Sequence, residues 1–209
     1  MTIKKEILFN YLDELYPNAH CELNYSKDYE LLIAIMLSAQ TTDKAVNKAT
    51  AILFNKYPTL IDLKNADIND IEKCISFLGM YKNKAKHIIG IATIIIDKFS
   101  GVVPTNESDL ISLPGVGNKT KNCYLAEWCN KPLLAVDTHV QRISKRLKIV
   151  SPKDDPKAIE EKLMKFIPND RLIKTNHQLI WFGRYFCKAI SPNCKNCKIC
   201  EFCKEKIAI

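Results

Sequence analysis

The sequence contains no apolar run long enough to cross a membrane, no strand-like alternation of apolar and polar residues, no internal repeat and no low-complexity linker. No apolar region follows a basic start at the N-terminus, because residues 1–16 have the spacing of an amphipathic helix. These absences exclude a membrane-spanning protein, a secretory precursor and a repeat protein, so we expect a soluble, cytoplasmic protein. Because no strand-like alternation is present, helix is the expected regular secondary structure, and the predicted fold class is all-α.

Arginine is scarce for a chain whose formal net charge is +8, and it occurs only at Arg142, Arg146, Arg171 and Arg184. The positive charge is therefore mostly lysine, which suits contact with phosphates better than bidentate reading of bases. Hydrophobic residues make up 47% of the 209 residues, which is enough for a packed core and excludes a disordered chain. The expected partner is nucleic acid, recognised mainly through its backbone.

Hydrophobic spacing, capping residues and prolines predict helices along almost the whole chain. The segment 29–39 is apolar on all sides, so it should be a central buried helix. A later helix, capped by Asp137, carries a basic face at Arg142, Lys145, Arg146 and Lys148. The predicted helices span residues 1–16, 29–39, 43–57, 60–65, 68–77, 84–99, 106–111, 119–129, 138–148, 156–167 and 170–187.

Two of the six glycines fall in one tight connection, LPGVGNKT at residues 113–120. Pro114 and Gly115 should end one helix, and Gly117 would allow a positive φ just before the next begins. Such a turn leaves backbone N–H groups open at a helix N-terminus, which suits a phosphate. Lys119 lies in the first helical turn, where the helix dipole and partial burial should make its amine easier to deprotonate and so a better nucleophile. The alternative is a plain helix–turn–helix corner with a solvated lysine.

Cysteine usage divides the chain into two parts. Cys21, Cys74, Cys123 and Cys129 are dispersed in helical, apolar contexts and are interpreted as small buried hydrophobes. The other five gather at the C-terminus: Cys187, Cys194, Cys197, Cys200 and Cys203. Because disulfides are unlikely in an intracellular chain, the second group predicts a metal site.

Several segments together resemble one known family. The hairpin LPGVGNKT, the segment AVDTH at 135–139, the terminal cysteines, SAQTTD at 38–43 and LGMYKNKAKHI at 78–88 are similar, in order and spacing, to segments of endonuclease III. That family belongs to the helix-hairpin-helix superfamily of DNA base-excision glycosylases. The resemblance covers essentially the whole chain and implies two helical lobes. One would span residues 21–133 with the hairpin, and the other would join residues 1–20 to 134–209 with an iron–sulfur cluster loop at 187–203.

The resemblance implies two catalytic residues. The family lysine that matches Lys119 attacks the deoxyribose C1′ of a damaged nucleotide, and the resulting Schiff base leads to β-elimination on the 3′ side. The residue that matches Asp137 shuttles protons and steadies a cationic sugar. The alternative for Asp137 is an N-cap and nothing more. The two side chains would face each other across a cleft between the lobes.

The resemblance also implies DNA contacts. The target base must be flipped out of the duplex, and the family fills the gap with a glutamine that matches Gln40 and an apolar wedge that matches Met80. Core packing or an exposed turn is the alternative for Met80. Backbone amides at Gly115 and Gly117 would hold a phosphate, or the glycines would serve turn geometry alone. His139 would orient Asp137 or contact DNA, or it would be a packed helix histidine.

The terminal cysteines Cys187, Cys194, Cys197 and Cys203 have the spacing C-x6-C-x2-C-x5-C, which is similar to the family's cluster loop and implies a [4Fe–4S] cofactor. Tetrahedral zinc is the competing interpretation. Cys194, Cys197, Cys200 and Cys203 form a second, evenly spaced set, but the family pattern omits Cys200. Three loop lysines, Lys188, Lys195 and Lys198, would meet phosphates or be solvated.

The predicted function is a base-excision-repair DNA glycosylase with AP lyase activity on oxidised pyrimidines in duplex DNA. A mismatch or oxidised-purine glycosylase, and a non-catalytic cluster-bearing damage sensor, are the alternatives. Adenine-specific relatives carry a glutamate where this chain has Ala34 and usually lack the lysine, which argues against adenine excision. Lys121 departs from the small residue usual in the family. The expected partner is duplex DNA with damaged bases or abasic sites, bound by a monomer that would lie at the nucleoid in a bacterium.

Overall fold

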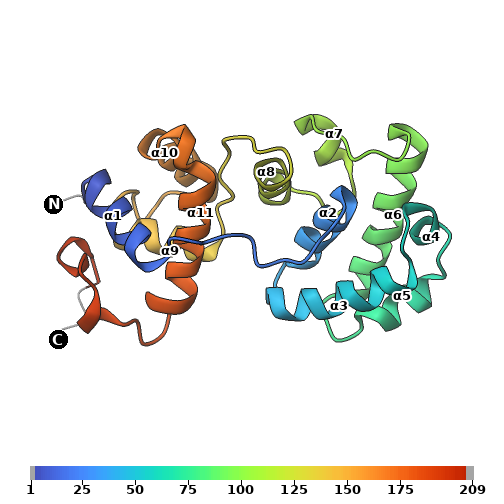
Figure 1. Cartoon of the computed structure of the whole chain (residues 1–209), viewed down its shortest axis with the longest axis horizontal. Helices are drawn as coiled ribbons and strands as arrows, with labels where there is room; N and C mark the ends of the chain where they lie inside the picture. Colours follow the sequence, from blue (N-terminus) through green and yellow to red (C-terminus); the bar gives the residue numbers. More distant parts are fainter. Residues whose placement is uncertain (1–2, 206–209) are drawn as a thin grey trace. The chain divides into compact units, whose positions relative to one another are not determined.

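The computed structural model describes residues 3–205, and this part of the chain is helical with no strand, which confirms the all-α prediction. The chain divides into two compact units (Figure 1). We call residues 22–129 the hairpin unit, and residues 1–21 together with 130–209 the cysteine unit. The chain thus crosses between units at 21/22 and at 129/130, where the sequence predicted lobe boundaries at 20/21 and 133/134.

The hairpin unit is built around helix α2, which lies in the middle of the unit's other helices. Residues Tyr29–Leu37 of α2 are all buried, as the sequence predicted, and α2 contacts α3, α6 and α8. A helix with no polar face must be covered on every side, which is why it occupies the centre. The helices of this unit are α2 (Asp28–Leu37), α3 (Asp43–Lys56), α4 (Leu60–Lys64), α5 (Ile68–Ile75), α6 (Tyr81–Phe99), α7 (Glu107–Ser112) and α8 (Asn118–Glu127).

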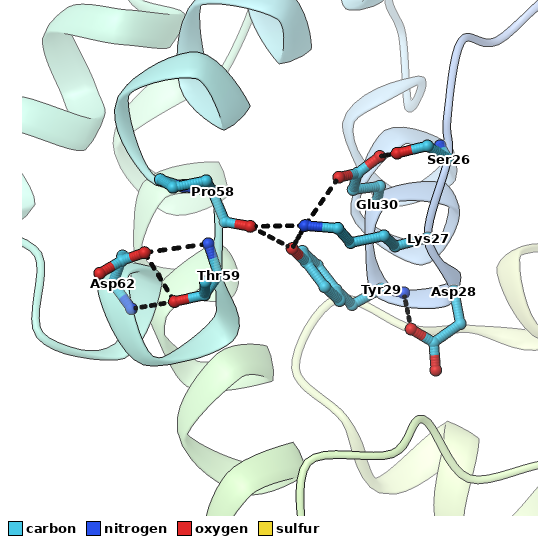
Figure 2. A network of polar contacts seen from close by, with 8 residues as sticks. All are labelled: Ser26, Lys27, Asp28, Tyr29, Glu30, Pro58, Thr59 and Asp62. Carbon is cyan, nitrogen blue, oxygen red and sulfur yellow. Dashed lines mark hydrogen bonds and ion pairs between the residues drawn. The ribbon is translucent and has the colours of Figure 1, made fainter.

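A polar network fixes the N-terminal end of α2 (Figure 2). Lys27 Nζ and the Tyr29 hydroxyl both donate to the carbonyl oxygen of Pro58, each at 2.7 Å. The backbone N–H and the hydroxyl of Ser26 donate to Glu30 Oε2 at 2.8 Å. The start of α2 is therefore tied to the turn between α3 and α4.

Side-chain caps set several helix starts where the sequence predicted them. Thr42 Oγ1 accepts from the backbone N–H of Ala45 at the start of α3, and Asp67 and Asn106 cap α5 and α7 in the same way. Helix α6 begins three residues earlier than predicted, at Tyr81. The reason is Met80, which takes a left-handed conformation (φ 56°) as N-cap and turns the chain into the helix directly after Gly79.

The cysteine unit packs four α-helices around a second core. They are α1 (Lys5–Leu15), α9 (Thr138–Arg146), α10 (Pro156–Phe166) and α11 (Leu172–Trp181). The core side chains come from all four helices and include Leu8, Leu12, Val140, Ile143, Ile159, Leu163 and Leu179. Asp13 joins α1 to α11, because its carboxylate accepts from Lys174 at 2.9 Å and from Gln178 at 2.8 Å.

The predicted helix 170–187 is helical over residues 169–186, but it is not a single α-helix, and the prediction is corrected in this respect. A 3₁₀ turn, η1 (Asn169–Arg171), precedes α11, and a π-helical turn, η2 (Phe182–Phe186), follows it. In η2 the backbone N–H of Cys187 bonds to the carbonyl of Phe182 at 2.7 Å, so the helix widens as it enters the cysteine loop. Hydrophobic spacing does not reveal such a turn, because it adds a single residue to one helical turn.

The four dispersed cysteines are less buried than predicted. Cys74 is buried, but Cys21, Cys123 and Cys129 are half-buried. Cys21 and Cys129 lie outside the helices, in the segments that follow α1 and α8, where less of the fold covers them. Among residues 3–205, no helix is both long enough and apolar enough to span a membrane.

Candidate active site and cysteine loop

The hairpin between α7 and α8 depends on one left-handed glycine. Gly115 has a φ of 77°, and a Cβ built on it would lie 2.6 Å from Nδ1 of His87 and 3.1 Å from Cγ of Met36. The following residue, Val116, is buried and its N–H bonds to the carbonyl of Leu113 at 3.2 Å, which closes the turn. Both the conformation and the space therefore require glycine at position 115.

The positive φ predicted at Gly117 is wrong. Gly117 is the N-cap of α8 with a φ of −100° and a ψ of −176°, an extended conformation open to any residue. The left-handed step comes two residues earlier because Gly115 alone reverses the chain after Pro114. No side chain caps α8, and a Cβ built on Gly117 would meet nothing within 4 Å. The first N–H groups of α8 therefore face an open space in front of the helix, which suits a phosphate oxygen.

Lys119 is the second residue of α8 and is exposed. The sequence predicted partial burial of this side chain, and that part is wrong for residues 3–205, because no neighbouring element covers the first turn of the helix. Its place in the first turn, at the positive end of the helix dipole, is as predicted.

Lys121, one of the family departures, has a structural partner. Its side chain is 9% exposed, and Nζ lies 2.5 Å from Oε2 of Glu107, whose side chain is 58% exposed. Glu107 is the first residue of α7, so this ion pair spans the hairpin from α7 to α8. Lys121 therefore braces the hairpin, and its charge is matched within the fold.

Two exposed turns of the hairpin unit present Gln40 and Met80. Both residues are left-handed, with φ of 54° and 56°, and both side chains are exposed. The Gln40 turn follows α2 and closes through the N–H of Thr41, which bonds to the carbonyl of Ser38 at 3.1 Å. Core packing, the alternative considered for Met80, is excluded by its exposure of 53%.

Asp137 caps α9 in the cysteine unit. Its Oδ1 accepts from the N–H of Val140 at 2.7 Å, so the predicted N-cap is confirmed. Within residues 3–205, Oδ2 receives no hydrogen bond, so one carboxylate oxygen holds the helix and the other is available to a proton donor. Asp137 and Lys119 lie in different units.

His139 is held inside the cysteine unit. Its Cβ and Nδ1 lie close to the Cα of Gly183, where an added methyl group would approach them to 2.8 and 3.1 Å, and Arg142 Nη2 lies 3.3 Å from Nδ1. Burial lowers the pKa of His139; the Asp137 carboxylate opposes this, and the charges of Arg142 and Arg184 reinforce it. A neutral ring with Nδ1 as acceptor fits these contacts. The geometry favours a packed residue that orients its surroundings over a direct DNA contact.

The basic face predicted on α9 is solvated only in part: Lys148 is exposed and Lys145 half-buried, but the two arginines turn inward. Arg146 is buried and donates to the carbonyl of Lys188 at 2.8 Å and to Sγ of Cys187 at 3.4 Å. Arg142 donates to the carbonyls of Gly183 at 2.7 Å and Cys187 at 3.2 Å. The two arginines turn inward because η2 leaves carbonyl groups without helical partners, and guanidinium groups satisfy them.

All five C-terminal cysteines line one cavity of about 280 Å³ in the cysteine unit. Apolar walls come from Ile143, Leu147, Phe182 and Ile199. No group of three His, Cys, Asp or Glu side chains among the described residues converges as a single metal ion would require. The thiols therefore surround a space instead of meeting at a point.

Without a bound metal, the buried cysteines of this cavity favour the protonated thiol over the thiolate. Burial raises the pKa of Cys197 to about 11, and burial also raises the pKa of Cys187, although the nearby Arg146 partly opposes it. A buried thiolate needs a positive partner, and bound iron supplies one. The set of thiols, the apolar walls and the Arg146 guanidinium, which donates to Sγ of Cys187, fit an iron–sulfur cluster. Of the loop lysines, Lys198 forms an ion pair with Glu14, whereas Lys188 and Lys195 are exposed.

The hairpin between α7 and α8 and the N-cap Asp137 both lie in the part of the chain that matches a known family. Residues 33–169 match the model of the HhH-GPD superfamily of base excision DNA repair proteins. Endonuclease III of Bacillus subtilis is 41% identical over 96% of this chain and 91% of its own length, and that of Escherichia coli is 38% identical over 95% and 94%. A solved structure of a trapped covalent intermediate between endonuclease III and DNA superposes with a TM-score of 0.93 at 42% identity, over 98% of this chain and 97% of that one. The chain therefore belongs to the endonuclease III family of base excision repair enzymes.

Sequence reasoning missed the residues that support the site. The inward-turning Arg142 and Arg146 were assigned to a surface, and Lys84, which is buried beneath the Gln40 turn, was not singled out. A signal for the arginines was present, since they lie four residues apart on the face of α9 that also carries Ile143. A signal for Lys84 was also present, because it precedes Ile88 and Ile91 at helical spacing on the buried face of α6, unlike Lys82 and Lys86.

Proposed function

We propose that this protein excises oxidised pyrimidines from duplex DNA and cuts the strand at the resulting abasic site, with Lys119 as the nucleophile. The chain is a bifunctional DNA glycosylase and AP lyase. The observation that carries the residue assignment is the position of Lys119, an exposed amine in the first turn of α8, directly behind the glycine-built hairpin. The likeness to a trapped covalent endonuclease III–DNA intermediate supports an enzyme that bonds to its substrate.

The chemistry uses two groups of this chain. The unprotonated amine of Lys119 forms a bond to the sugar C1′ while the bond from C1′ to the base breaks, and the base leaves with the electron pair and takes up a proton. Loss of a proton from the nitrogen and opening of the sugar give an iminium ion. The iminium withdraws electrons, a proton leaves C2′, and the bond to the 3′ phosphate breaks. Asp137, through Oδ2, would accept and return the protons and balance the positive sugar.

The duplex would be held by backbone amides and by two inserted side chains. The open N-terminus of α8 at Gly117, shaped by Gly115, would receive a phosphate of the damaged strand. Gln40 and Met80, exposed at the tips of their turns, would enter the space left by the flipped nucleotide. His139 would keep Asp137 and α9 in place, and its direct contact with DNA stays a prediction.

Cys187, Cys194, Cys197 and Cys203 would hold a [4Fe–4S] cluster in the cavity of the cysteine unit. When bound, the cluster would act as an internal cross-link of the loop and would not exchange electrons during excision. The exposed Lys188 and Lys195 on this loop would then be presented to phosphates as a fixed pair. A brown protein that contains iron and inorganic sulfide in equal amounts is expected; a colourless protein with one zinc would contradict the assignment.

Borohydride trapping tests the assignment of Lys119. With a duplex that contains one abasic site, the unaltered protein should give a covalent adduct that survives denaturation, and Lys119→Ala should give none. The matched control is Lys131→Ala, a half-buried lysine of the cysteine unit outside the hairpin, which should trap as the unaltered protein does. An adduct of normal yield from Lys119→Ala would refute the assignment.

Asp137→Asn tests the proton-transfer role against the cap alone. Asparagine is as good an N-cap as aspartate, so the helix start and duplex binding should be retained. Base excision under single-turnover conditions should fall by about 10²-fold or more, the range expected for a lost acid–base group. Excision near the normal rate would leave Asp137 as a cap only. A panel of duplexes with single oxidised pyrimidines or purines then separates the proposed substrates from the alternatives.

A further inference from the structure

Lys84 is a buried lysine that the reaction described above does not use. It lies in the first turn of α6 and is only 3% exposed. Its Nζ donates to the carbonyl of Ala39 at 3.0 Å and to the hydroxyl of Thr41 at 2.8 Å. These two acceptors flank Gln40 on either side, so the ammonium group closes the base of the Gln40 turn.

The charge of Lys84 is not matched within the described residues. No carboxylate there pairs with it, and burial lowers the pKa of its ammonium group. Lys121, the other buried lysine of the hairpin unit, differs because it forms an ion pair with Glu107. An ammonium group without a counter-ion is costly to bury, and an apolar side chain of the same length would be cheaper. The position is therefore poorly explained by stability alone.

The same residue also meets the second exposed turn. The backbone N–H of Lys84 donates to the carbonyl of Met80 at 3.1 Å, which is the first hydrogen bond of α6. Lys84 thus contacts the Met80 turn through its backbone and the Gln40 turn through its side chain. Those turns hold the two left-handed, exposed residues of the hairpin unit that are proposed to enter the duplex.

We propose that Lys84 is a positioning residue that ties the Gln40 turn to the Met80 turn, so that both side chains enter the gap in the duplex together. The role in DNA binding rests on the proposed function, whereas the hydrogen bonds of Lys84 to the two turns lie within the hairpin unit. Lys84 acts through Gln40 and Met80 and does not touch the reacting atoms.

The first variant is Lys84→Met, which keeps the stem and removes both hydrogen bonds. The matched control is Lys86→Met, which removes the same charge from an exposed position on the same helix. The probe is a duplex that carries a tetrahydrofuran abasic analogue, which the protein cannot cleave. We expect Lys84→Met to weaken binding of this duplex on the order of tenfold relative to Lys86→Met, with equal binding of undamaged duplex by the two.

Two further measurements separate positioning from a loss of folding. Thr41→Val removes one acceptor without touching the lysine, and it should weaken binding of the analogue duplex in the same direction by a smaller factor. Hydrogen exchange at residues 38–41 should be faster in Lys84→Met and unchanged in Lys86→Met, while exchange in α8 stays normal. In a Gln40→Ala, Met80→Ala background, adding Lys84→Met should change binding by less than about twofold, because the groups it positions are gone.

The inference is overturned if Lys84→Met binds the analogue duplex as Lys86→Met does, or if its full effect persists in the Gln40→Ala, Met80→Ala background. Unchanged exchange at residues 38–41 would also overturn it. Failure of the proposed function would be seen separately, as the absence of a borohydride adduct from the unaltered protein.

Discussion

Three glycines of the hairpin unit allow the two reasons for glycine at position 115, the left-handed backbone and the lack of space for a side chain, to be measured separately. Gly101 and Gly115 both have a left-handed φ, of 82° and 77°, but a Cβ on Gly101 would meet nothing within 4 Å. Gly117 has neither a positive φ nor a neighbour at that distance. Gly101→Ala therefore measures the cost of the left-handed backbone alone. Gly115→Ala adds a steric clash to that cost, and Gly117→Ala has neither cost.

The expected losses in the free energy of unfolding follow from these contacts. Gly101→Ala should cost about 1 kcal/mol, the usual penalty for a left-handed L-residue. At Gly115 the new methyl group would lie 2.6 Å from His87 Nδ1, and displacing that ring adds roughly 1–2 kcal/mol, for a total of about 2–3 kcal/mol. Gly117→Ala should change stability by less than about 0.5 kcal/mol.

Urea unfolding of the hairpin unit gives the measurement. The chain has two tryptophans, and Trp128 lies in the hairpin unit, so a Trp181→Phe background makes its fluorescence the reporter. His87→Ala should recover the steric part in the Gly115→Ala protein and leave about 1 kcal/mol. If Gly115→Ala costs no more than Gly101→Ala, the packing of His87 against the hairpin is wrong. Gly117→Ala should keep the normal free energy of unfolding yet bind duplex more weakly, since its methyl group would occupy the space proposed for the phosphate at the N-terminus of α8.

Three further results are expected. Burial would raise the pKa of Asp13, but hydrogen bonds from Lys174 and others outweigh it and lower the pKa to about 2. The ionised carboxylate therefore stabilises the fold by about 1 kcal/mol above pH 4, and this stability should be lost as the pH falls from 4 towards 2. In an acid titration of the free energy of unfolding, Asp13→Asn should lack that loss. Arg146→Met should lose the visible absorbance of the cluster several-fold faster in a chelator than Lys145→Met, because the donor to Cys187 Sγ is gone; equal rates would contradict this. Glu107→Ala should destabilise the protein in urea more than Lys121→Met, since it leaves a buried ammonium unpaired.

The course of the chain was predictable where local chemistry decides it. Helices α3 and α5 begin at the predicted residues, where Thr42 and Asp67 cap them, and the all-apolar segment at α2 is buried. These features depend on a few neighbouring residues, so the sequence carries them in full.

The parts that failed depend on contacts between distant segments. Arg142 and Arg146 of α9 turn inward because η2 and the cysteine loop, 41 and 42 residues later, offer them carbonyl oxygens. Gly117 was assigned the left-handed step because the sequence cannot say which of two glycines meets His87. The spacing of Lys84 to Ile88 and Ile91 places it on the buried face of α6, but its acceptors in the Gln40 turn lie more than forty residues away and could not be predicted.

The most direct test of the account is the identity of the residue that bonds to DNA. The borohydride-trapped adduct of the unaltered protein is digested, and the peptide that carries the sugar remnant is sequenced by mass spectrometry. The account predicts that the remnant lies on the ε-nitrogen of Lys119, the second residue of α8. A remnant on Lys121, on another lysine or on the N-terminal amine would contradict it.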